Sequence, residues 1–259
     1  MAVHLGDVSL RLELEIGLVD QLQTAHPSAP ETAEQTEVEF YVPARGTDFK
    51  KYLLDDDIIG LHHLSRYEWA VRVLRDRKPR CIIDVACGAG YGSHMLADNI
   101  PCASVSGCDY DPRSAIFARD HYQANNLNFV TGDIVTWCDS DGVSLGKFDA
   151  IVTFDTIEHV EHREIALLSL CRNLADDGAM LFSTPSAHRQ NLLKPSWEHH
   201  KIEYCAQDLS DLMRRFFRVV LSPADSDFPH RAFWSDEVNG ASQRYPNIAN
   251  PLFCQGPIR

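Results

Sequence analysis

The sequence is poor in basic residues: 24 Lys and Arg stand against 37 Asp and Glu, which leaves a formal net charge of −13. The deficit is largest in residues 1–40, where eight acids accompany a single base, Arg11. A protein that binds an extended nucleic acid needs clustered Lys and Arg to displace the counterions of the phosphate backbone. The chain offers no obvious cluster of this kind, so we do not expect nucleic acid as a partner.

The sequence also lacks long apolar runs and C-x-x-C pairs. No apolar stretch approaches the ~20 residues of a membrane-spanning helix, and the first residues lack the basic and apolar blocks of a signal peptide. The eight cysteines are spread from Cys81 to Cys254 without paired spacing. This is typical of small buried residues in a reducing compartment rather than of a disulfide framework. We therefore expect a cytoplasmic protein without a membrane partner.

Against these absences, one segment carries a strong motif. Residues 81–92 form an apolar run that contains Asp84 and then breaks into Gly88, Gly90 and Gly92. Glycine adopts positive φ and lets the backbone come close to a ligand. Asp109 follows Gly88 by 21 residues, at the end of a second apolar run. An acid at that offset can accept hydrogen bonds from both hydroxyls of a ribose, so the segment predicts a nucleoside cofactor.

Two missing features narrow the choice of cofactor. The phosphate loop G-x-x-x-x-G-K-S/T is absent, and the third glycine comes one residue earlier than in the dinucleotide pattern G-x-G-x-x-G, with Ser93 in the later place. Asp84 is a poor neighbour for a diphosphate but a good one for a cation, because opposite charges stabilise each other at short range. The pattern therefore favours a cationic cofactor without phosphate over the cofactor of a dinucleotide oxidoreductase.

The segment Asp84-Val-Ala-Cys-Gly-Ala-Gly90 resembles the first motif of the class I S-adenosylmethionine-dependent methyltransferases. Residues 128–134, 148–155 and 174–185 look like the later motifs of this family, in the same order, and the last of them looks like a helix, a tight turn and a strand. The phrase around Arg66 is similar to the helix before the first strand in ubiquinone-type O-methyltransferases. Other phrases look like bacterial enzymes that modify glycans and small metabolites. The resemblance covers roughly residues 58–222.

The resemblance implies S-adenosylmethionine as the cofactor and S-adenosylhomocysteine as the product. It assigns the ribose to Asp109, the adenine amino group to Asp133 and the cofactor's carboxylate to Arg66. The cofactor-binding residues that it implies are Arg66, Asp84, Ala86, Gly88, Gly90, Asp109, Tyr110, Asp133, Ile134 and Phe154.

The alternation of strands and helices from residue 58 to about residue 221 predicts a parallel sheet covered on both faces. Together with the resemblance, it predicts an α/β fold with a doubly wound, mostly parallel, seven-stranded sheet of the Rossmann-like methyltransferase type. We expect a partly flexible N-terminal extension at residues 1–37, with a strand at residues 8–16, and a methyltransferase domain at residues 38–259. We also expect a helix at residues 55–77, a helix capped by Asp111 and Pro112, and a last antiparallel strand near residues 252–255.

Methyl transfer from a sulfonium is a direct displacement, so the protein must align the acceptor and remove a proton from a hydroxyl. The segment Asp155-Thr-Ile-Glu158-His159 follows the predicted fourth strand. His159 is the predicted catalytic base, because an imidazole accepts a proton near neutral pH. The alternative is that His159 packs under the loop or caps a helix. His162 is expected at a solvated helix start.

A histidine from the later segment, His188, His199 or His200, could join Glu158 and His159 around a divalent metal. Imidazole and carboxylate are suitable ligands, and Glu158, His159 and His200 are the alternative metal set. The arrangement resembles the small-RNA 3′-terminal 2′-O-methyltransferases. In this chain, however, Asp155 stands where those enzymes have their first Glu, and the downstream phrase differs. We therefore expect no metal at the site.

The sequence predicts an S-adenosylmethionine-dependent methyltransferase that methylates an oxygen of a sugar or of another small hydroxylated metabolite. Its partner would be a small-molecule acceptor. Two alternatives stay open: a metal-dependent RNA 3′-terminal 2′-O-methyltransferase, and a non-catalytic partner protein that binds S-adenosylmethionine. The sequence leaves open the identity of the acceptor and the oligomeric state, a homo-oligomer included.

Overall fold

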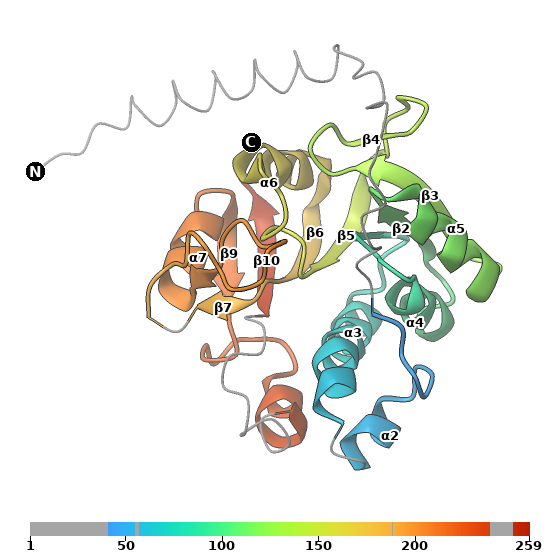
Figure 1. Ribbon diagram of the computed structural model, residues 1–259, viewed down its shortest axis with the longest axis horizontal. Helices are drawn as coiled ribbons and strands as arrows, with labels where there is room; N and C mark the ends of the chain where they lie inside the picture. The colour runs from blue at the N-terminus through green and yellow to red at the C-terminus, as the bar shows by residue number, and fades with distance from the viewer. Residues whose placement is uncertain (1–40, 55–56, 188, 239–250) are drawn as a thin grey trace, which may run out of the picture.

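The computed structural model describes residues 41–54, 57–187, 189–238 and 251–259, which form a mixed sheet with helices on both faces (Figure 1). The predicted N-terminal extension and its strand at residues 8–16 lie outside the described residues. The domain boundary at residue 37 therefore stays a prediction.

The main sheet has the strand order β4-β3-β2-β1-β5-β6-β10-β9. Its members are β1 (Cys81–Val85), β2 (Ser104–Asp109), β3 (Leu127–Asp133), β4 (Cys138–Asp139), β5 (Phe148–Phe154), β6 (Leu174–Ser183), β9 (Phe217–Leu221) and β10 (Leu252–Pro257). Neighbours from β3 to β6 are parallel, whereas β10 is antiparallel to both β6 and β9, and β4 is antiparallel to β3. A separate pair joins β7 (Ser186–Ala187) to β8 (Tyr204–Cys205).

This topology confirms the predicted doubly wound, mostly parallel sheet and its last antiparallel strand. The eighth strand is the two-residue β4, a small addition at the edge beside β3. One local prediction is wrong: the segment that begins at Leu174 is strand from its first residue, because the preceding helix ends at Asn173. The sheet register shifts at the start of β6, beside Phe148 and Ala150 of β5.

The helices of the described chain are α2 (Phe49–Leu54), α3 (Ile58–Arg77), α4 (Tyr91–Asn99), α5 (Pro112–His121), α6 (Arg163–Asn173) and α7 (Ala206–Met213), with a π-helical turn η1 (Phe233–Val238). The Asp57 side chain caps α3 by accepting a hydrogen bond from the Gly60 N–H, so this helix begins three residues later than predicted. Asp111 caps α5 and Pro112 is its first residue, as predicted.

The side chains of β1 alternate between two apolar cores. Ile82 belongs to a core that includes Leu64 of α3 and Leu96 of α4. Its neighbour Ile83 belongs to a second core, together with Leu167 of α6. Because successive side chains of a strand point to opposite faces, β1 is buried on both faces of the sheet.

Strand β1 is also the point at which the sheet changes direction. From β1 the chain proceeds outward through β2 and β3, and then returns to place β5 against the other side of β1. In open α/β sheets, ligands bind in the crevice that such a reversal creates at the carboxyl ends of the strands. The residues that follow β1 and β5 are therefore the first place to look for a site.

All eight cysteines are unpaired, and five of them are buried: Cys87, Cys108, Cys171, Cys205 and Cys254. The prediction of small buried residues is confirmed for these five, whereas Cys81 and Cys138 are half-buried and Cys102 is exposed. Among the described residues, no helix has the length and apolar character that crossing a membrane requires.

Candidate functional site

The turn between β1 and α4 has an unusual backbone. Ala86, Gly88 and Gly90 all have positive φ, at 56°, 52° and 87°. A Cβ atom on Gly90 would lie 2.5 Å from the Cβ of Ala118, so a larger residue could not occupy this position without moving α5. The glycines therefore allow both the tight turn and the close packing of α4 beside α5.

Asp109, at the end of β2, faces this turn. Its Oδ2 accepts a hydrogen bond from the Gly88 N–H at 2.8 Å, and its Oδ1 accepts one from the Asp111 N–H at 3.0 Å. The side chain is partly exposed. Burial raises the pKa of Asp109, and the two backbone hydrogen bonds oppose that rise. A carboxylate has about four lone-pair positions, so two bonds leave Asp109 able to accept further hydrogen bonds.

Asp84 lies in β1, one residue before the end of the strand, and its side chain is completely buried. Its carboxylate accepts hydrogen bonds from the hydroxyl of Tyr67 at 3.2 Å and from that of Ser93 at 2.7 Å. Burial raises the pKa of Asp84 to about 7, although both hydroxyls act to lower it. The carboxylate thus joins β1 to α3 and α4, and its predicted place beside a cation stays a prediction.

The next predicted residues lie along the edge formed by β2 and β3. Asp133 ends β3, and its Oδ1 accepts a hydrogen bond from the Val135 N–H at 2.7 Å. Ile134 packs partly buried against the second core. Tyr110, directly after Asp109, is 74% exposed. These positions agree with a binding edge at the carboxyl ends of the strands, and their predicted contacts with the cofactor stay predictions.

Arg66 of α3 reaches the end of β5. The guanidinium is buried, and its Nη1 donates to Asp155 Oδ2 at 2.5 Å. His62 Nε2 lies 3.4 Å from the same oxygen, and the Ser183 hydroxyl donates to Asp155 Oδ1 at 3.1 Å. Burial opposes ionisation of Asp155, but the Arg66 charge outweighs it, and the pKa of this carboxyl lies below its ordinary value.

Two buried nitrogen atoms near this ion pair lack hydrogen-bond partners: Arg66 Nε and His62 Nδ1. An unmet buried donor is costly unless a ligand or water satisfies it. The contact between Arg66 and the cofactor's carboxylate stays a prediction. Phe154 lies beside the pair, with its ring centroid 5.8 Å from Arg66 Cζ and 5.1 Å from that of Tyr67, and belongs to the first core.

Beyond β5, the structure brings together Glu158, His159 and His200, whose ligand atoms lie within 4.8 Å of one another. His159 Nε2 is 3.8 Å from Glu158 Oε1, and the two imidazole centroids are 4.9 Å apart. The Lys201 N–H donates to the backbone oxygen of Glu158 at 2.7 Å, which holds the two segments side by side. His200 thus lies close to Glu158 and His159, as the alternative prediction of a metal site requires.

Glu158 is completely buried in this cluster. Its Oε2 accepts a hydrogen bond from the Thr184 hydroxyl at 2.8 Å, whereas Oε1 has no hydrogen-bond partner. Burial, and then the neighbouring Asp155 charge, raise the pKa of Glu158 well above its ordinary value.

The two histidines are held by their Nδ1 atoms. His159 Nδ1 is 3.3 Å from the backbone oxygen of His199, and His200 Nδ1 is 2.7 Å from Glu203 Oε1. The His159 side chain is 33% exposed, so a predicted base at this position can meet a substrate. His162 is exposed at the first turn of α6, as predicted, and His188 lies outside the described residues.

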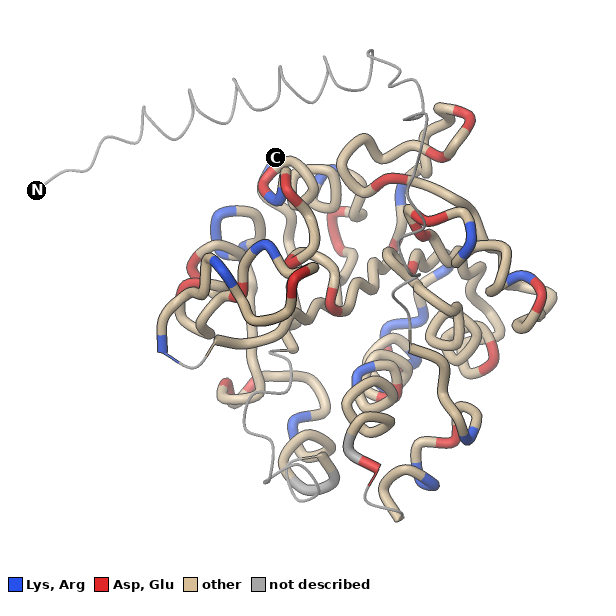
Figure 2. The backbone as a smooth tube through the Cα atoms, viewed as in Figure 1, with Lys and Arg blue, Asp and Glu red and all other residues tan. Residues whose placement is uncertain are grey.

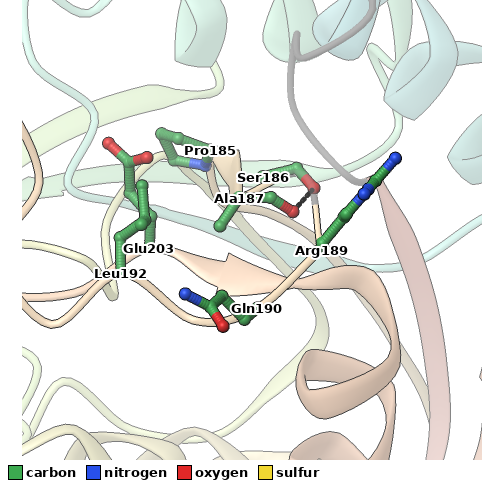
Figure 3. A pocket seen from close by; sticks show the side chains of 7 residues that line it. All are labelled: Pro185, Ser186, Ala187, Arg189, Gln190, Leu192 and Glu203. Carbon is green, nitrogen blue, oxygen red and sulfur yellow. Dashed lines mark hydrogen bonds between the residues drawn. The ribbon is translucent and has the colours of Figure 1, made fainter.

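A pocket of about 580 Å³ opens beside the cluster. Its lining residues are Pro185, Ser186, Ala187, Arg189, Gln190, Leu192 and Glu203. In Figure 3, Glu203 and Leu192 lie together on one side of the pocket and Arg189 on the other. Glu203 belongs to both features: the residue lines the pocket, and its carboxylate bonds His200.

Four residues that hold Asp155, Glu158 and His200 were not predicted: His62, Ser183, Thr184 and Glu203. His62 stands one helical turn before Arg66, and Glu203 stands three residues after His200, so their spacing was a usable signal. Ser183 ends β6 beside β5 and Thr184 follows it, and only the pairing of these strands brings their hydroxyls to Asp155 and Glu158.

The family model described as a methyltransferase domain matches residues 78–232 of the chain. The match begins just before β1 and ends after β9, so it contains the glycine turn, Asp109 and the cluster around Glu158.

Similar proteins include the malonyl-(acyl-carrier protein) O-methyltransferase of Acetivibrio thermocellus, which is 30% identical over 110 residues, 42% of this chain and 37% of that protein. The demethylmenaquinone methyltransferase of Thermus thermophilus is 30% identical over 116 residues, 43% of this chain and 50% of that protein. The chain thus spans half or less of the length of these relatives.

Among solved structures, a plantazolicin methyltransferase in complex with S-adenosylhomocysteine superposes with a TM-score of 0.54 at 13% identity, over 97% of this chain and 100% of that one. An O-methyltransferase from a polyketide multienzyme of Brevibacillus brevis, also with S-adenosylhomocysteine, gives a TM-score of 0.53 at 12% identity, over 86% of this chain and 84% of that one. At such identities the likeness concerns the fold.

Proposed function

Because the chain belongs to the methyltransferase domain family, we propose that it transfers a methyl group from S-adenosylmethionine to an oxygen of a sugar or of another small hydroxylated metabolite. Eight unpaired cysteines also support the reducing cytoplasm as its location.

The observation that carries the proposal is the placement of Asp109 against the glycine turn. Backbone N–H groups of Gly88 and Asp111 orient its carboxylate, and the remaining lone pairs can accept from two ribose hydroxyls. The turn lies at the strand reversal beside β1, where this class of fold binds ligands.

Further residues fit the other parts of S-adenosylmethionine. Asp133 would accept the adenine amino group, with Ile134 beside the ring and Tyr110 exposed next to the ribose site. The unpartnered Nε of Arg66 would donate a hydrogen bond to the carboxylate of the cofactor. This contact would lie where α3 approaches the end of β5. When bound, this cofactor supplies an electrophilic methyl group on a positively charged sulfur.

The acceptor side of the proposed site is the cluster of Glu158, His159 and His200 together with the neighbouring pocket. A pocket of about 580 Å³ is large enough for a small metabolite, and Ser186, Arg189, Gln190 and Glu203 offer it hydrogen-bonding groups. The cluster would remove the hydroxyl proton, with the partly exposed His159 as the imidazole predicted to accept it.

A small acceptor suits the charge of this chain better than RNA does. Lys and Arg are scattered along the described backbone and are interrupted by Asp and Glu (Figure 2). The formal net charge of −13 opposes the approach of a polyanion.

The proposal is tested by calorimetric titration of the purified chain with S-adenosylhomocysteine, followed by transfer from methyl-labelled S-adenosylmethionine. The acceptor panel would contain sugars, small hydroxylated metabolites and a short RNA with a free 3′ end. We expect S-adenosylhomocysteine binding and label in a small acceptor. Absence of binding would refute the cofactor assignment, binding with label in RNA alone would refute the acceptor class, and binding with no label in any acceptor would favour the non-catalytic alternative.

A further inference from the structure

We propose that Glu158, His159 and His200 bind a divalent first-row transition-metal ion on the acceptor side of the site. The three side chains come from the loop after β5 and from the segment before β8, which are about 40 residues apart in sequence. Their potential ligand atoms lie within 4.8 Å of one another, close enough for small movements to place all three around one ion. Nitrogen and carboxylate ligands suit such ions.

The first independent support is the state of Glu158. This carboxylate is completely buried, and Thr184 satisfies only Oε2. Oε1 has no hydrogen-bond partner and lies on the side of His159, 3.8 Å from its Nε2. Buried polar and charged groups are normally hydrogen-bonded, paired or bound to a metal, because leaving an oxygen unsatisfied is costly. A cation between Oε1 and the histidines would remove that cost.

The second support is the way in which both rings are held. A backbone oxygen can only accept, so His159 Nδ1 donates its proton to the oxygen of His199. His200 Nδ1 donates to the Glu203 carboxylate in the same manner. In a neutral imidazole with its proton on Nδ1, the lone pair is on Nε2. Outer partners of this kind are the usual supports of metal-binding histidines and carboxylates.

Asp155 is not part of the set. Its two oxygens accept hydrogen bonds from Arg66 and Ser183, and the Arg66 guanidinium already compensates its charge. The site would therefore have three protein ligands, two imidazoles and one carboxylate, which leaves at least one coordination position for water or for the acceptor. Two imidazole nitrogens favour a transition ion such as Zn²⁺, Mn²⁺ or Co²⁺ over Mg²⁺.

The use of the ion rests on the proposed function. An ion that binds the acceptor hydroxyl lowers its pKa, so the proton leaves to water. The oxygen then forms a bond to the methyl carbon as the bond from that carbon to sulfur breaks, which yields the methyl ether and S-adenosylhomocysteine. His159 would then hold the ion rather than accept the proton itself.

The test uses the full chain, stripped with a chelator and dialysed. Zn²⁺ and Mg²⁺ are titrated by calorimetry, and the visible absorption of added Co²⁺ reports whether nitrogen ligands surround it. We expect one Zn²⁺ per chain, much weaker Mg²⁺ binding, and a Co²⁺ spectrum that shifts from that of the aquo ion. His200→Ala and Glu158→Gln should each weaken Zn²⁺ binding at least tenfold. Glu203→Gln, which alters an outer partner, should weaken it about 10- to 100-fold.

His162→Asn is the matched control, because it removes an exposed imidazole three residues after His159 and should leave Zn²⁺ affinity unchanged. S-adenosylhomocysteine is titrated into each variant. Unchanged Zn²⁺ affinity in His200→Ala, or equal loss in His162→Asn, would overturn the metal site even where S-adenosylhomocysteine still binds. Metal binding by a chain that does not bind S-adenosylhomocysteine would support the metal site while refuting the proposed function.

Discussion

The two sides of the site are built differently. On the nucleoside side, Asp109 and Asp133 accept hydrogen bonds from backbone N–H groups of the glycine turn or just after their own strands. Asp84 accepts them from the hydroxyls of Ser93 in α4 and Tyr67 in α3. On the acceptor side, Asp155 and Glu158 depend on partners from α3, from the end of β6 and from the segment before β8.

The buried polar atoms without hydrogen-bond partners mark the same division. In the described part of the chain they belong to His62, Arg66, Glu158 and Trp234. Three of these four surround the end of β5, and none belongs to the three aspartates of the nucleoside side. The comparison teaches that the aspartates of the nucleoside side are already satisfied by hydrogen bonds within the chain, whereas the acceptor side holds groups that a ligand or an ion would satisfy.

The change His159→Asn is expected to distinguish the two sides most clearly, because it should affect turnover without affecting cofactor affinity. Loss of this imidazole should lower turnover by about 10²- to 10⁴-fold, because proton removal from the acceptor becomes slow. S-adenosylhomocysteine affinity, measured by calorimetry, should be unchanged, since the nucleoside contacts are elsewhere. A chelator then distinguishes the roles: it should abolish wild-type turnover if His159 holds an ion and spare it if His159 is the base. Equal turnover in variant and wild type would remove His159 from both roles.

Arg66→Met tests the ion pair that joins α3 to the end of β5. The change leaves the carboxylate of Asp155, whose side chain is 21% exposed, without its closest cation, which should lower the free energy of unfolding by about 3 kcal/mol in urea denaturation. The double variant Arg66→Met with Asp155→Asn should recover part of the loss, because no charge is then left unpaired. Strict additivity of the two changes would show that the pair is not coupled.

Asp109→Ala tests the nucleoside side directly. Removal of the oriented carboxylate should weaken S-adenosylhomocysteine binding by about 1 to 3 kcal/mol, as two ribose hydroxyls lose their acceptors. Asp111→Asn in the same turn is the control, since asparagine also caps α5 and the backbone N–H remains. Calorimetric affinities that are equal for Asp109→Ala and wild type would contradict the ribose assignment.

The smallest expected effect concerns Asp84 and pH. Its pKa is about 7 in the folded chain against 3.8 ordinarily, so between pH 5 and 6 the folded state keeps a proton that the unfolded state has lost. The contribution of Asp84 to the free energy of unfolding is fully present below pH ~4 and is lost as pH rises through ~7. Between these values the free energy of unfolding should fall by about 1.4 kcal/mol per pH unit. Asp84→Asn should lack this slope in urea denaturation at pH 5 and 6. Parallel pH dependences would mean that Asp84 is ionised in the folded chain.

Sequence reasoning reached much of the nucleoside side. The run of β1, the glycines and the offset of Asp109 are local or follow from strand order, and the structure places Asp109 against the turn as expected. It also anticipated the group of Glu158, His159 and His200 as an alternative, although it favoured a site without metal. It did not anticipate that Asp84 accepts hydrogen bonds from Tyr67 and Ser93, because a sequence does not show which helices pack against the end of a strand.

By itself, the sequence determined the order of strands and helices, the caps of α5 and the glycine turn, because these depend on neighbours within a few residues. Only the tertiary structure decided that Arg66 pairs with Asp155, that Thr184 supports Glu158, and that Glu158 Oε1 is left without a partner. The physical reason is that burial and pairing of a charge depend on segments that meet through the sheet, 26 residues apart for Thr184 and Glu158 and 89 for Arg66 and Asp155, and no local pattern records that meeting.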